Sequence, residues 1–181
     1  MVKSTSVFLV GFMGSGKTTL GKKLANKLAM PFVDLDRMIT DDVEMSIPEY
    51  FQRFGEAEFR SREAESLRSL DLQVPSVVSV GGGTPCYHDN MTWMNQQGIT
   101  IYLKLPAKAL WERLQKSDVT KRPVLKGLYG EDLLNFIQSK LAEREPVYLQ
   151  STFVVNQLKD KVHQIIDLCG LKKLESYDRD S

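Results

Sequence analysis

The sequence predicts a three-layer α/β fold with a parallel central sheet of five strands, and three observations support this prediction. Short apolar runs alternate along the chain with longer segments of helical periodicity, as expected when helices connect parallel strands. Several of these runs are apolar throughout, which indicates strands that helices cover on both faces. A glycine-rich stretch joins the first apolar run to the first helical segment, where the backbone of such folds often approaches a ligand.

The expected strands coincide with the apolar runs. The first strand is expected at Ser6–Val10, and the first helix follows at Lys17–Leu28, where leucine recurs every four residues. The remaining strands are expected at residues 32–35, 76–80, 99–105 and 153–155.

The segments between the strands predict helices and two irregular features. Helices are expected at residues 47–54 and 57–70 on either side of Gly55, from about Ala107 onward, and at residues 158–168. Residues 37–72 therefore form a helical insertion between the second and third strands. Residues 116–130 are polar, basic and rich in turn formers, which favours a mobile lid. With no linker or repeat, we expect a single domain over residues 1–181, with a frayed tail at residues 172–181.

Composition and charge exclude several classes of protein. Hydrophobic residues make up 42% and charged residues 26% of the 181 positions, which is typical of a folded soluble chain. Twenty-four Lys and Arg oppose 23 Asp and Glu, and this balance argues against a general nucleic-acid binder. The two cysteines cannot build a disulfide framework, and their surroundings suggest no zinc site. No early apolar run can span a membrane, and a signal peptide has no room, so we expect a cytoplasmic protein.

The glycine-rich stretch is the strongest functional signal. Residues 11–18 read G-F-M-G-S-G-K-T and match the motif G-x-x-x-x-G-K-[ST] between a strand and a helix. Glycines let the backbone aim consecutive N–H groups at an anion, and the start of the helix adds its positive dipole end. Lys17 can reach terminal phosphates, and the Thr18 hydroxyl can bind Mg²⁺. An ordinary glycine-rich turn is the alternative, but it would not require this motif in this context.

Two aspartates follow the second strand. Because alternate residues of a strand point to the same side, Asp34 and Asp36 should both face the crevice at the carboxyl edge of the sheet. One carboxylate could hold Mg²⁺ through water, and the other could accept a proton from an attacking hydroxyl. Solvated loop acids, or a helix N-cap near Met38, explain the spacing equally well.

Three further features suggest a binding site for an anionic acceptor. Arg60 and Glu63 are helical neighbours, so Glu63 could orient Arg60 toward an anion, although an exposed ion pair has the same spacing. Three consecutive glycines at residues 81–83 suggest close approach of another group to the backbone. Arg122 precedes a proline in the polar segment, and Arg144 lies near a helix end signalled by Pro146; each taken alone is more typical of a surface arginine.

Taken together, these motifs resemble the shikimate kinase family. The resemblance covers most of the chain, from about Val7 to Asn156, at comparable spacing. Its motifs are K-T-T-L-G from Lys17, D-L-D from Asp34, F-R-S-R-E from Phe59, G-G-G-T-P from Gly81, R-P at Arg122, and R-E-P-V-Y from Arg144. The first motif is shared by many P-loop proteins, whereas the ordered combination is much more specific.

The resemblance implies a P-loop small-molecule kinase that uses ATP and Mg²⁺ and phosphorylates the 3-hydroxyl of shikimate. It implies that Asp36 is the base, that Arg122 closes from the lid onto the phosphates, and that Thr18 and Asp34 serve Mg²⁺. The implied phosphate-binding residues are Gly14, Ser15, Gly16, Lys17, Thr18 and Thr19. The implied shikimate-binding residues are Asp36, Phe51, Phe59, Arg60, Glu63, Gly82 and Arg144.

The resemblance also places adenine beside Arg113, while the second adenine loop, after Asn156, is abbreviated in this chain. It implies a monomer that binds neither nucleic acid nor a membrane. The alternatives are another small-molecule kinase, such as a gluconate or nucleoside-monophosphate kinase, and a nucleotide-dependent regulatory module. A GTPase switch is excluded because the chain has no N-K-x-D run.

Overall fold

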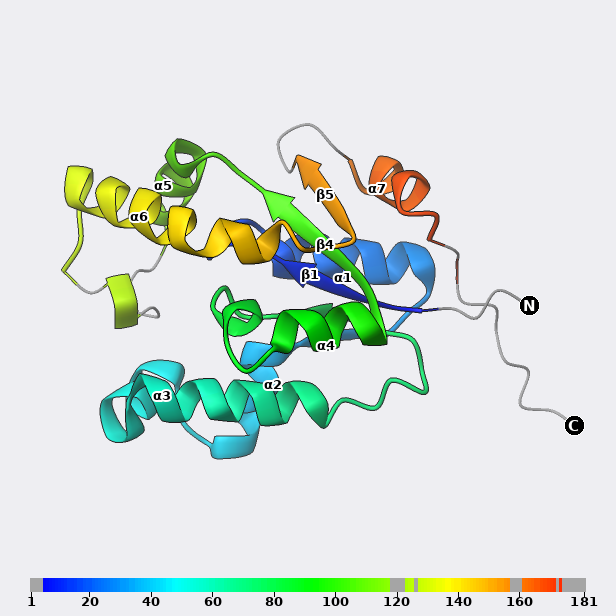
Figure 1. Cartoon of the computed structure of the whole chain (residues 1–181), viewed down its shortest axis with the longest axis horizontal. Coiled ribbons are helices and arrows are strands. Elements are labelled where there is room, and N and C mark those ends of the chain that lie inside the picture. Colours follow the sequence, from blue (N-terminus) through cyan, green and yellow to red (C-terminus); the bar gives the residue numbers. More distant parts are fainter. Residues whose placement is uncertain (1–4, 118–122, 126, 157–160, 172, 174–181) are drawn as a thin grey trace, which may run out of the picture.

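The protein has an α/β architecture built on one parallel sheet (Figure 1). A computed structural model describes residues 5–117, 123–125, 127–156, 161–171 and 173. The five strands have the order β2–β3–β1–β4–β5, and all neighbouring strands are parallel. They are β1 (Ser6–Val10), β2 (Phe32–Asp34), β3 (Val77–Ser79), β4 (Gly98–Lys104) and β5 (Phe153–Asn156). The predicted fold class is therefore confirmed.

Helices connect the strands in the described parts of the chain. The α-helices are α1 (Lys17–Leu28), α2 (Leu35–Val43), α3 (Ile47–Arg68), α4 (Asn90–Gln97), α5 (Ala107–Gln115), α6 (Gly130–Tyr148) and α7 (Val162–Leu168). Two short 3₁₀ helices, η1 (Thr84–Cys86) and η3 (Pro123–Leu125), lie between them. None of these helices is long and apolar enough to cross a membrane.

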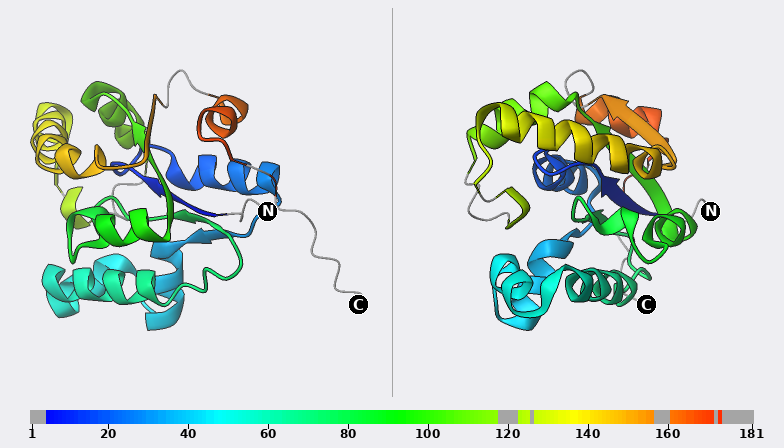
Figure 2. Two further views of the ribbon diagram at one scale, coloured as in Figure 1. Left: turned by 45° about the vertical axis from the view of Figure 1, so that its right-hand side comes forward. Right: turned by 60° about the vertical axis from the view of Figure 1, so that its left-hand side comes forward.

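The helices form layers on both faces of the sheet (Figure 2). Successive residues of β1 point to opposite layers, because side chains alternate across a strand. Val7 and Leu9 pack in the cluster that includes α1 and α7, whereas Phe8 and Val10 pack in the cluster that includes α4, α5 and α6. The β1 side chains of both sets are fully buried, which explains why this strand is apolar throughout.

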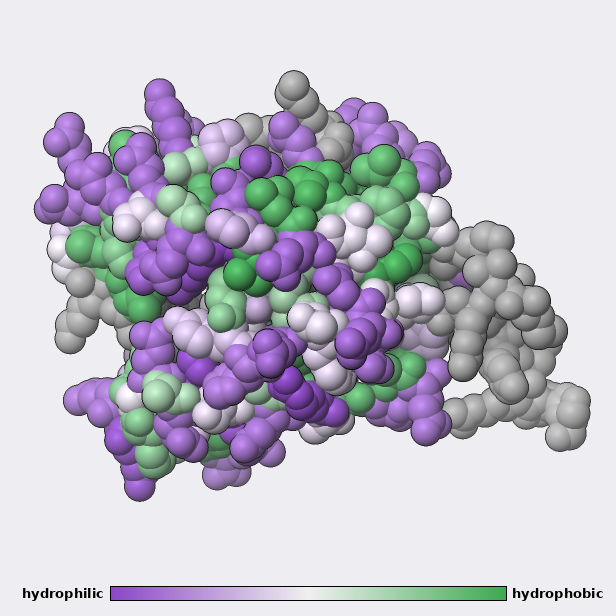
Figure 3. All heavy atoms as spheres, in the orientation of Figure 1, coloured by the Kyte–Doolittle hydropathy of each residue, from purple (hydrophilic) through white to green (hydrophobic). Residues whose placement is uncertain are grey.

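Parallel pairing brings the carboxyl ends of three strands together. Ser79 of β3 is paired with both Leu9 of β1 and Asp34 of β2. The loop after β1, the start of α2 and the glycines after β3 therefore leave the sheet at the same edge. The face that carries α3, α4 and α6 is largely hydrophilic, with scattered hydrophobic side chains (Figure 3).

Several predicted boundaries are wrong. The second strand ends at Asp34, and α2 begins immediately afterwards, because the Asp34 side chain caps this helix by accepting a hydrogen bond from the Arg37 amide. Asp36 is consequently helical, and the strand-alternation argument for it fails. The predicted break at Gly55 is confirmed, because two helical stretches of α3 meet there at a kink, where Gly55 has the non-helical φ 82° and ψ 172°.

Other differences concern helices. Helix α4 was not predicted, and α6 continues past Pro146 to Tyr148 instead of ending there. The last helix begins at Val162, since residues 157–160 of its predicted range lie outside the described residues. Most of the predicted tail and residues 118–122 and 126 of the predicted lid also lie outside them.

Candidate active site

The loop between β1 and α1 has a backbone that requires glycine. Gly14 and Gly16 have φ of 80° and 91°, in the left-handed region that other residues rarely adopt. Gly16 is also the N-cap residue of α1, so the following amides open toward the loop. The Lys17 ammonium donates hydrogen bonds to the carbonyl oxygens of Gly11, at 2.7 Å, and Phe12, at 3.0 Å. The loop thus combines the amides of a helix start with a fixed cation.

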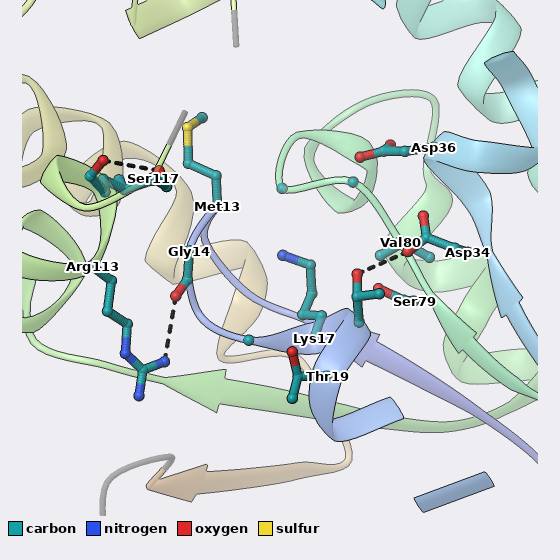
Figure 4. A pocket seen from close by; sticks show the side chains of 15 residues that line it. Met13, Gly14, Lys17, Thr19, Asp34, Asp36, Ser79, Val80, Arg113 and Ser117 are labelled. Carbon is teal, nitrogen blue, oxygen red and sulfur yellow. Dashed lines mark hydrogen bonds between the residues drawn. The ribbon is translucent and has the colours of Figure 1, made fainter. Parts of the chain in front are cut away.

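A cavity of about 370 Å³ lies against this loop (Figure 4). The predicted phosphate-binding residues Gly14, Gly16, Lys17, Thr18 and Thr19 line it. Asp34, Asp36, Gly82 and Arg113 line it as well. This cavity therefore collects a cation, two carboxylates and a helix start, which suits a polyphosphate and its counterion.

Ser15 and Arg113, two further residues predicted to bind the nucleotide, lie beside this cavity in different environments. Ser15 is fully buried, and its hydroxyl has no hydrogen-bond partner among the described residues. Arg113, on α5, donates to the carbonyl oxygens of Gly14, at 3.4 Å, and Ser15, at 3.2 Å. The guanidinium of Arg113 thus braces the back of the loop and borders the cavity.

The first turn of α1 meets the end of β2 through one hydrogen bond. The Thr18 hydroxyl donates to the Asp34 carboxylate at 2.8 Å. Both groups are oxygen ligands of the type that Mg²⁺ prefers, and Mg²⁺ in nucleotide sites takes most of its other ligands from water and phosphate. The described residues contain no cluster of three or more acidic, His or Cys side chains around a metal position. The pair therefore fits a nucleotide-bound Mg²⁺ rather than an all-protein metal site.

Asp36 lies at the junction of two cavities. It lines the cavity of the glycine loop and a second one of about 120 Å³, and both also contact Met13, Gly81 and Gly82. Burial, with the nearby carboxylates of Glu63 and Asp34, raises the pKa of Asp36 to about 6. A carboxylate with such a pKa is mostly ionised at neutral pH and is a stronger base than an exposed aspartate.

The second cavity contains the predicted acceptor residues. Its lining includes Asp36, Phe51, Phe59, Arg60, Glu63, Gly82 and Arg144. Ile47 and Val124 line it too, and sequence reasoning missed both. A lining that combines two buried arginines with aromatic rings suits a small ring that carries an anionic group.

Carboxylates hold Arg60 in place. The Nη1 of Arg60 lies 2.6 Å from Glu63, and its Nη2 lies 2.8 Å from Glu56. Burial of Arg60 would lower its pKa, but the carboxylates of Glu63 and Glu56 outweigh it, and the pKa is raised. Thr84 donates a hydrogen bond to the other oxygen of Glu63 at 2.6 Å. The predicted Arg60–Glu63 pair is therefore a buried, hydrogen-bonded one and not an exposed one.

Arg144 has a different environment. Its side chain reaches the cavity from α6, the residue is only 6% exposed, and its guanidinium lies 5.8 Å from the centre of the Phe12 ring. Among the described residues, no carboxylate forms an ion pair with it. A buried guanidinium without a carboxylate partner can bind an anionic ligand with its full charge.

Glycine is required at positions 81 and 83 because neighbouring side chains lie where a Cβ atom would be. A Cβ on Gly81 would lie 2.6 Å from the Glu63 carboxylate and 2.9 Å from the Asp36 carboxylate. A Cβ on Gly83 would lie 2.5 Å from the Arg60 guanidinium. All three distances are shorter than van der Waals contact, so the two glycines let Glu63, Asp36 and Arg60 pack onto the backbone.

Three further residues complete the description of the site. Arg122 lies outside the described residues. Trp93 packs edge-to-face on Phe8, at 6.0 Å between ring centres, and therefore belongs to the packing between α4 and the sheet. Cys86 is partly buried, and burial raises its pKa, which does not favour a reactive thiolate.

Comparisons with known proteins agree with this geometry. The family model described as shikimate kinase matches residues 13–170. A curated shikimate kinase of Bacteroides fragilis (strain YCH46) is 39% identical over 170 residues, which cover 93% of this chain and 94% of that protein. One of Chlorobium chlorochromatii (strain CaD3) is 39% identical over 178 residues, covering 96% and 92%.

Solved structures lead to the same family. A shikimate kinase from Bacteroides thetaiotaomicron superposes with a TM-score of 0.84 at 38% identity, covering 92% of this chain and 99% of that one. A shikimate kinase from Acinetobacter baumannii, solved in complex with shikimate, has a TM-score of 0.80 at 30% identity and covers 93% and 90%. The family model, the curated relatives and the solved structures show together that this chain belongs to the shikimate kinase family.

Proposed function

We propose that the chain transfers the γ-phosphoryl group of Mg-ATP to the 3-hydroxyl of shikimate, giving shikimate 3-phosphate and ADP. The observation that carries this proposal is the shared wall between the two cavities. One cavity contains the glycine loop and Lys17, the other contains Arg60 and Arg144, and the Asp36 carboxylate lines both. An acceptor hydroxyl at this junction would lie between the base and the terminal phosphate.

The nucleotide side is assigned to the first cavity. The loop amides and Lys17 bind the ATP phosphates and offset the negative charge that the transferred group carries. Thr18 and Asp34 hold Mg²⁺, which neutralises phosphate charge when it is bound. Arg113, beside the loop, borders the position of the adenine, and Arg122 is expected to close onto the phosphates.

The acceptor side is assigned to the second cavity. Arg60 and Arg144 bind the shikimate carboxylate, since two guanidinium groups can each donate two parallel hydrogen bonds to it. Glu63 orients Arg60, Phe51 and Phe59 cover the ring, and the Gly82 amide donates to the substrate. Asp36 accepts the proton of the attacking hydroxyl, and orientation by the arginines supplies the proximity that phosphoryl transfer requires.

The test is ADP release from Mg-ATP in the presence of shikimate, with gluconate and AMP as competing acceptors. We expect strong stimulation by shikimate alone. Stimulation by gluconate or AMP instead would assign another acceptor, and ATP binding without turnover would indicate a regulatory module. The same preparation should be monomeric by light scattering, as the resemblance implies.

Two variants separate the two sides of the site. Lys17→Ala should abolish turnover, whereas Lys23→Ala, an exposed lysine on the same helix, should retain it. Arg144→Ala should raise the KM for shikimate far more than the KM for ATP. An unchanged shikimate KM would remove Arg144 from the acceptor site.

A further inference from the structure

Tyr148 interacts with two residues that line the acceptor cavity, Gly82 and Arg144, but does not line the cavity itself. It is the last residue of α6, it is fully buried, and its ring packs on Tyr102 of β4 with ring centres 5.2 Å apart. The family resemblance assigned no role to it. Its ring position is fixed by packing, so its hydroxyl occupies one defined place.

The hydroxyl of Tyr148 contacts both sides of the cavity wall. It donates a short hydrogen bond to the carbonyl oxygen of Gly82. The Arg144 guanidinium interacts with the same hydroxyl and opposes part of the rise in its pKa. A phenol has one proton to donate and lone pairs that accept, so it can make both interactions at once. Burial raises the pKa of Tyr148, which keeps this proton in place at neutral pH.

The contact with Gly82 restrains the central peptide of the glycine triplet, whose outer carbonyl oxygens, of Gly81 and Gly83, accept from the Thr84 and Cys86 amides. Three consecutive glycines have wide conformational freedom, and no side chain limits the central one. Because the peptide unit is planar, a hydrogen bond to the Gly82 carbonyl also fixes the orientation of the Gly82–Gly83 peptide. Gly82 and Gly83 both line the acceptor cavity, so this restraint defines part of its wall.

The contact with Arg144 differs from the contacts that hold Arg60. Glu56 and Glu63 hold Arg60 and also cancel much of its charge. A phenol hydroxyl and the face of the Phe12 ring hold Arg144, and neither carries a net charge. Tyr148 can therefore orient Arg144 while its positive charge stays available to a substrate anion.

We propose that Tyr148 is a positioning residue for the acceptor, which holds the Gly82 carbonyl and so fixes the Gly82–Gly83 backbone beside the Arg144 guanidinium that receives the substrate carboxylate. This inference rests on the proposed function, because the carboxylate belongs to shikimate. It predicts that loss of the hydroxyl weakens shikimate binding without a matching effect on ATP.

The experiment compares Tyr148→Phe with Tyr102→Phe. The second variant is a matched control: Tyr102 is the stacking partner, it is equally buried, and its hydroxyl donates to Glu145 and not to the site. We expect Tyr148→Phe to raise the shikimate KM by about tenfold or more, as for a lost hydrogen bond to a charged group. The ATP KM should stay within about twofold, and Tyr102→Phe should change neither constant.

A double-mutant cycle with Arg144→Lys tests whether Tyr148 acts through Arg144. In the Arg144→Lys background, Tyr148→Phe should have a much smaller effect on the shikimate KM. Thermal unfolding establishes that each variant is folded, and the ATP KM of each variant separates a loss of folded protein from a loss of shikimate binding.

Three results would overturn the inference: an unchanged shikimate KM in Tyr148→Phe, equal increases for shikimate and ATP, or full additivity in the cycle. Absence of shikimate turnover in the wild-type protein would instead count against the proposed function, so the two failures are distinguishable.

Discussion

Replacement of Glu63 by glutamine tests the buried ion pair that organises the acceptor cavity. Glutamine has nearly the same shape, so the change removes the negative charge without opening a cavity. The Glu63 and Arg60 side chains are 1% and 8% exposed, and their closest N–O distance is 2.6 Å. Breaking a buried pair by removing one charge costs about 3–5 kcal/mol.

The structure places Glu63→Gln near the lower end of this range. Arg60 keeps its second carboxylate partner, Glu56, at 2.8 Å, so its charge is not left without a partner. We therefore expect the free energy of unfolding to fall by about 3 kcal/mol. For a domain of this size, that loss corresponds to a decrease in Tm of roughly 6–12 °C.

The assay is urea unfolding followed by far-ultraviolet circular dichroism at pH 7.5. The control is Glu143→Gln, which removes the acidic partner of a pair with the same three-residue spacing, Lys140–Glu143 at 2.7 Å, on the surface of α6. That variant should lose well under about 1 kcal/mol, because solvent screens an exposed pair. If Glu63→Gln also lost less than about 1 kcal/mol, the argument from burial would be refuted.

Three further predictions concern the same cavity wall. Gly83→Ala should raise the shikimate KM while the protein stays folded, because the backbone at Gly83, with φ −90°, accepts alanine but the new Cβ would displace the Arg60 guanidinium. Asp36→Asn should lose most of kcat. Because the pKa of Asp36 is raised in the folded protein, ionisation of this carboxyl lowers the free energy of unfolding of the wild type as the pH rises through about 6. The asparagine variant lacks this loss, so it should become more stable relative to the wild type over the same pH range. Thr84→Val should raise the shikimate KM and Thr84→Ser should largely restore it, since the hydroxyl donates to Glu63.

Each of these predictions has its own contrary result. Chromatography and thermal unfolding measure the folded state of Gly83→Ala, and an unchanged KM would show that Arg60 adjusts freely. A stability difference between Asp36→Asn and wild type that does not vary between pH 4 and 8 would contradict the raised pKa. Equal behaviour of the valine and serine variants at position 84 would assign the effect to packing instead of the hydrogen bond.

The sequence predicted the sheet well because its strands are buried on both faces. Val7 to Val10 contribute to two cores at once, so the run is apolar throughout and easy to identify. The glycine loop was equally clear, because its motif combines glycines with a lysine and a threonine between a strand and a helix.

The position of Asp36 was harder to predict for a physical reason. The same side chain of Asp34 that faces Thr18 also caps α2, and a single cap decides whether the chain continues as strand or turns into helix. Both aspartates still line one cavity, because the first turn of α2 begins at the edge of the sheet. The prediction that both aspartates face one cavity is therefore correct, but the strand geometry from which it was argued is wrong for Asp36.

The apolar part of the acceptor cavity had no recognisable pattern in the sequence. Ile47 and Val124 are about 80 residues apart in the chain and belong to α3 and η3, and hydrophobic residues at such positions are usually assigned to the core. Helix α4 was missed because its buried face consists of few residues, mainly Met91 and Met94, which give a weak helical period.

The ammonium group of Lys17 is already solvated by the protein before any phosphate arrives. The carbonyl oxygens of Gly11 and Phe12 accept hydrogen bonds from this ammonium group. A phosphate that takes their place therefore exchanges one set of oxygen partners for another. Only the difference between the two sets contributes to affinity. The same carbonyls can accept hydrogen bonds from the lysine again once a phosphate leaves, so the loop provides its cation with oxygen partners whether or not the site is filled.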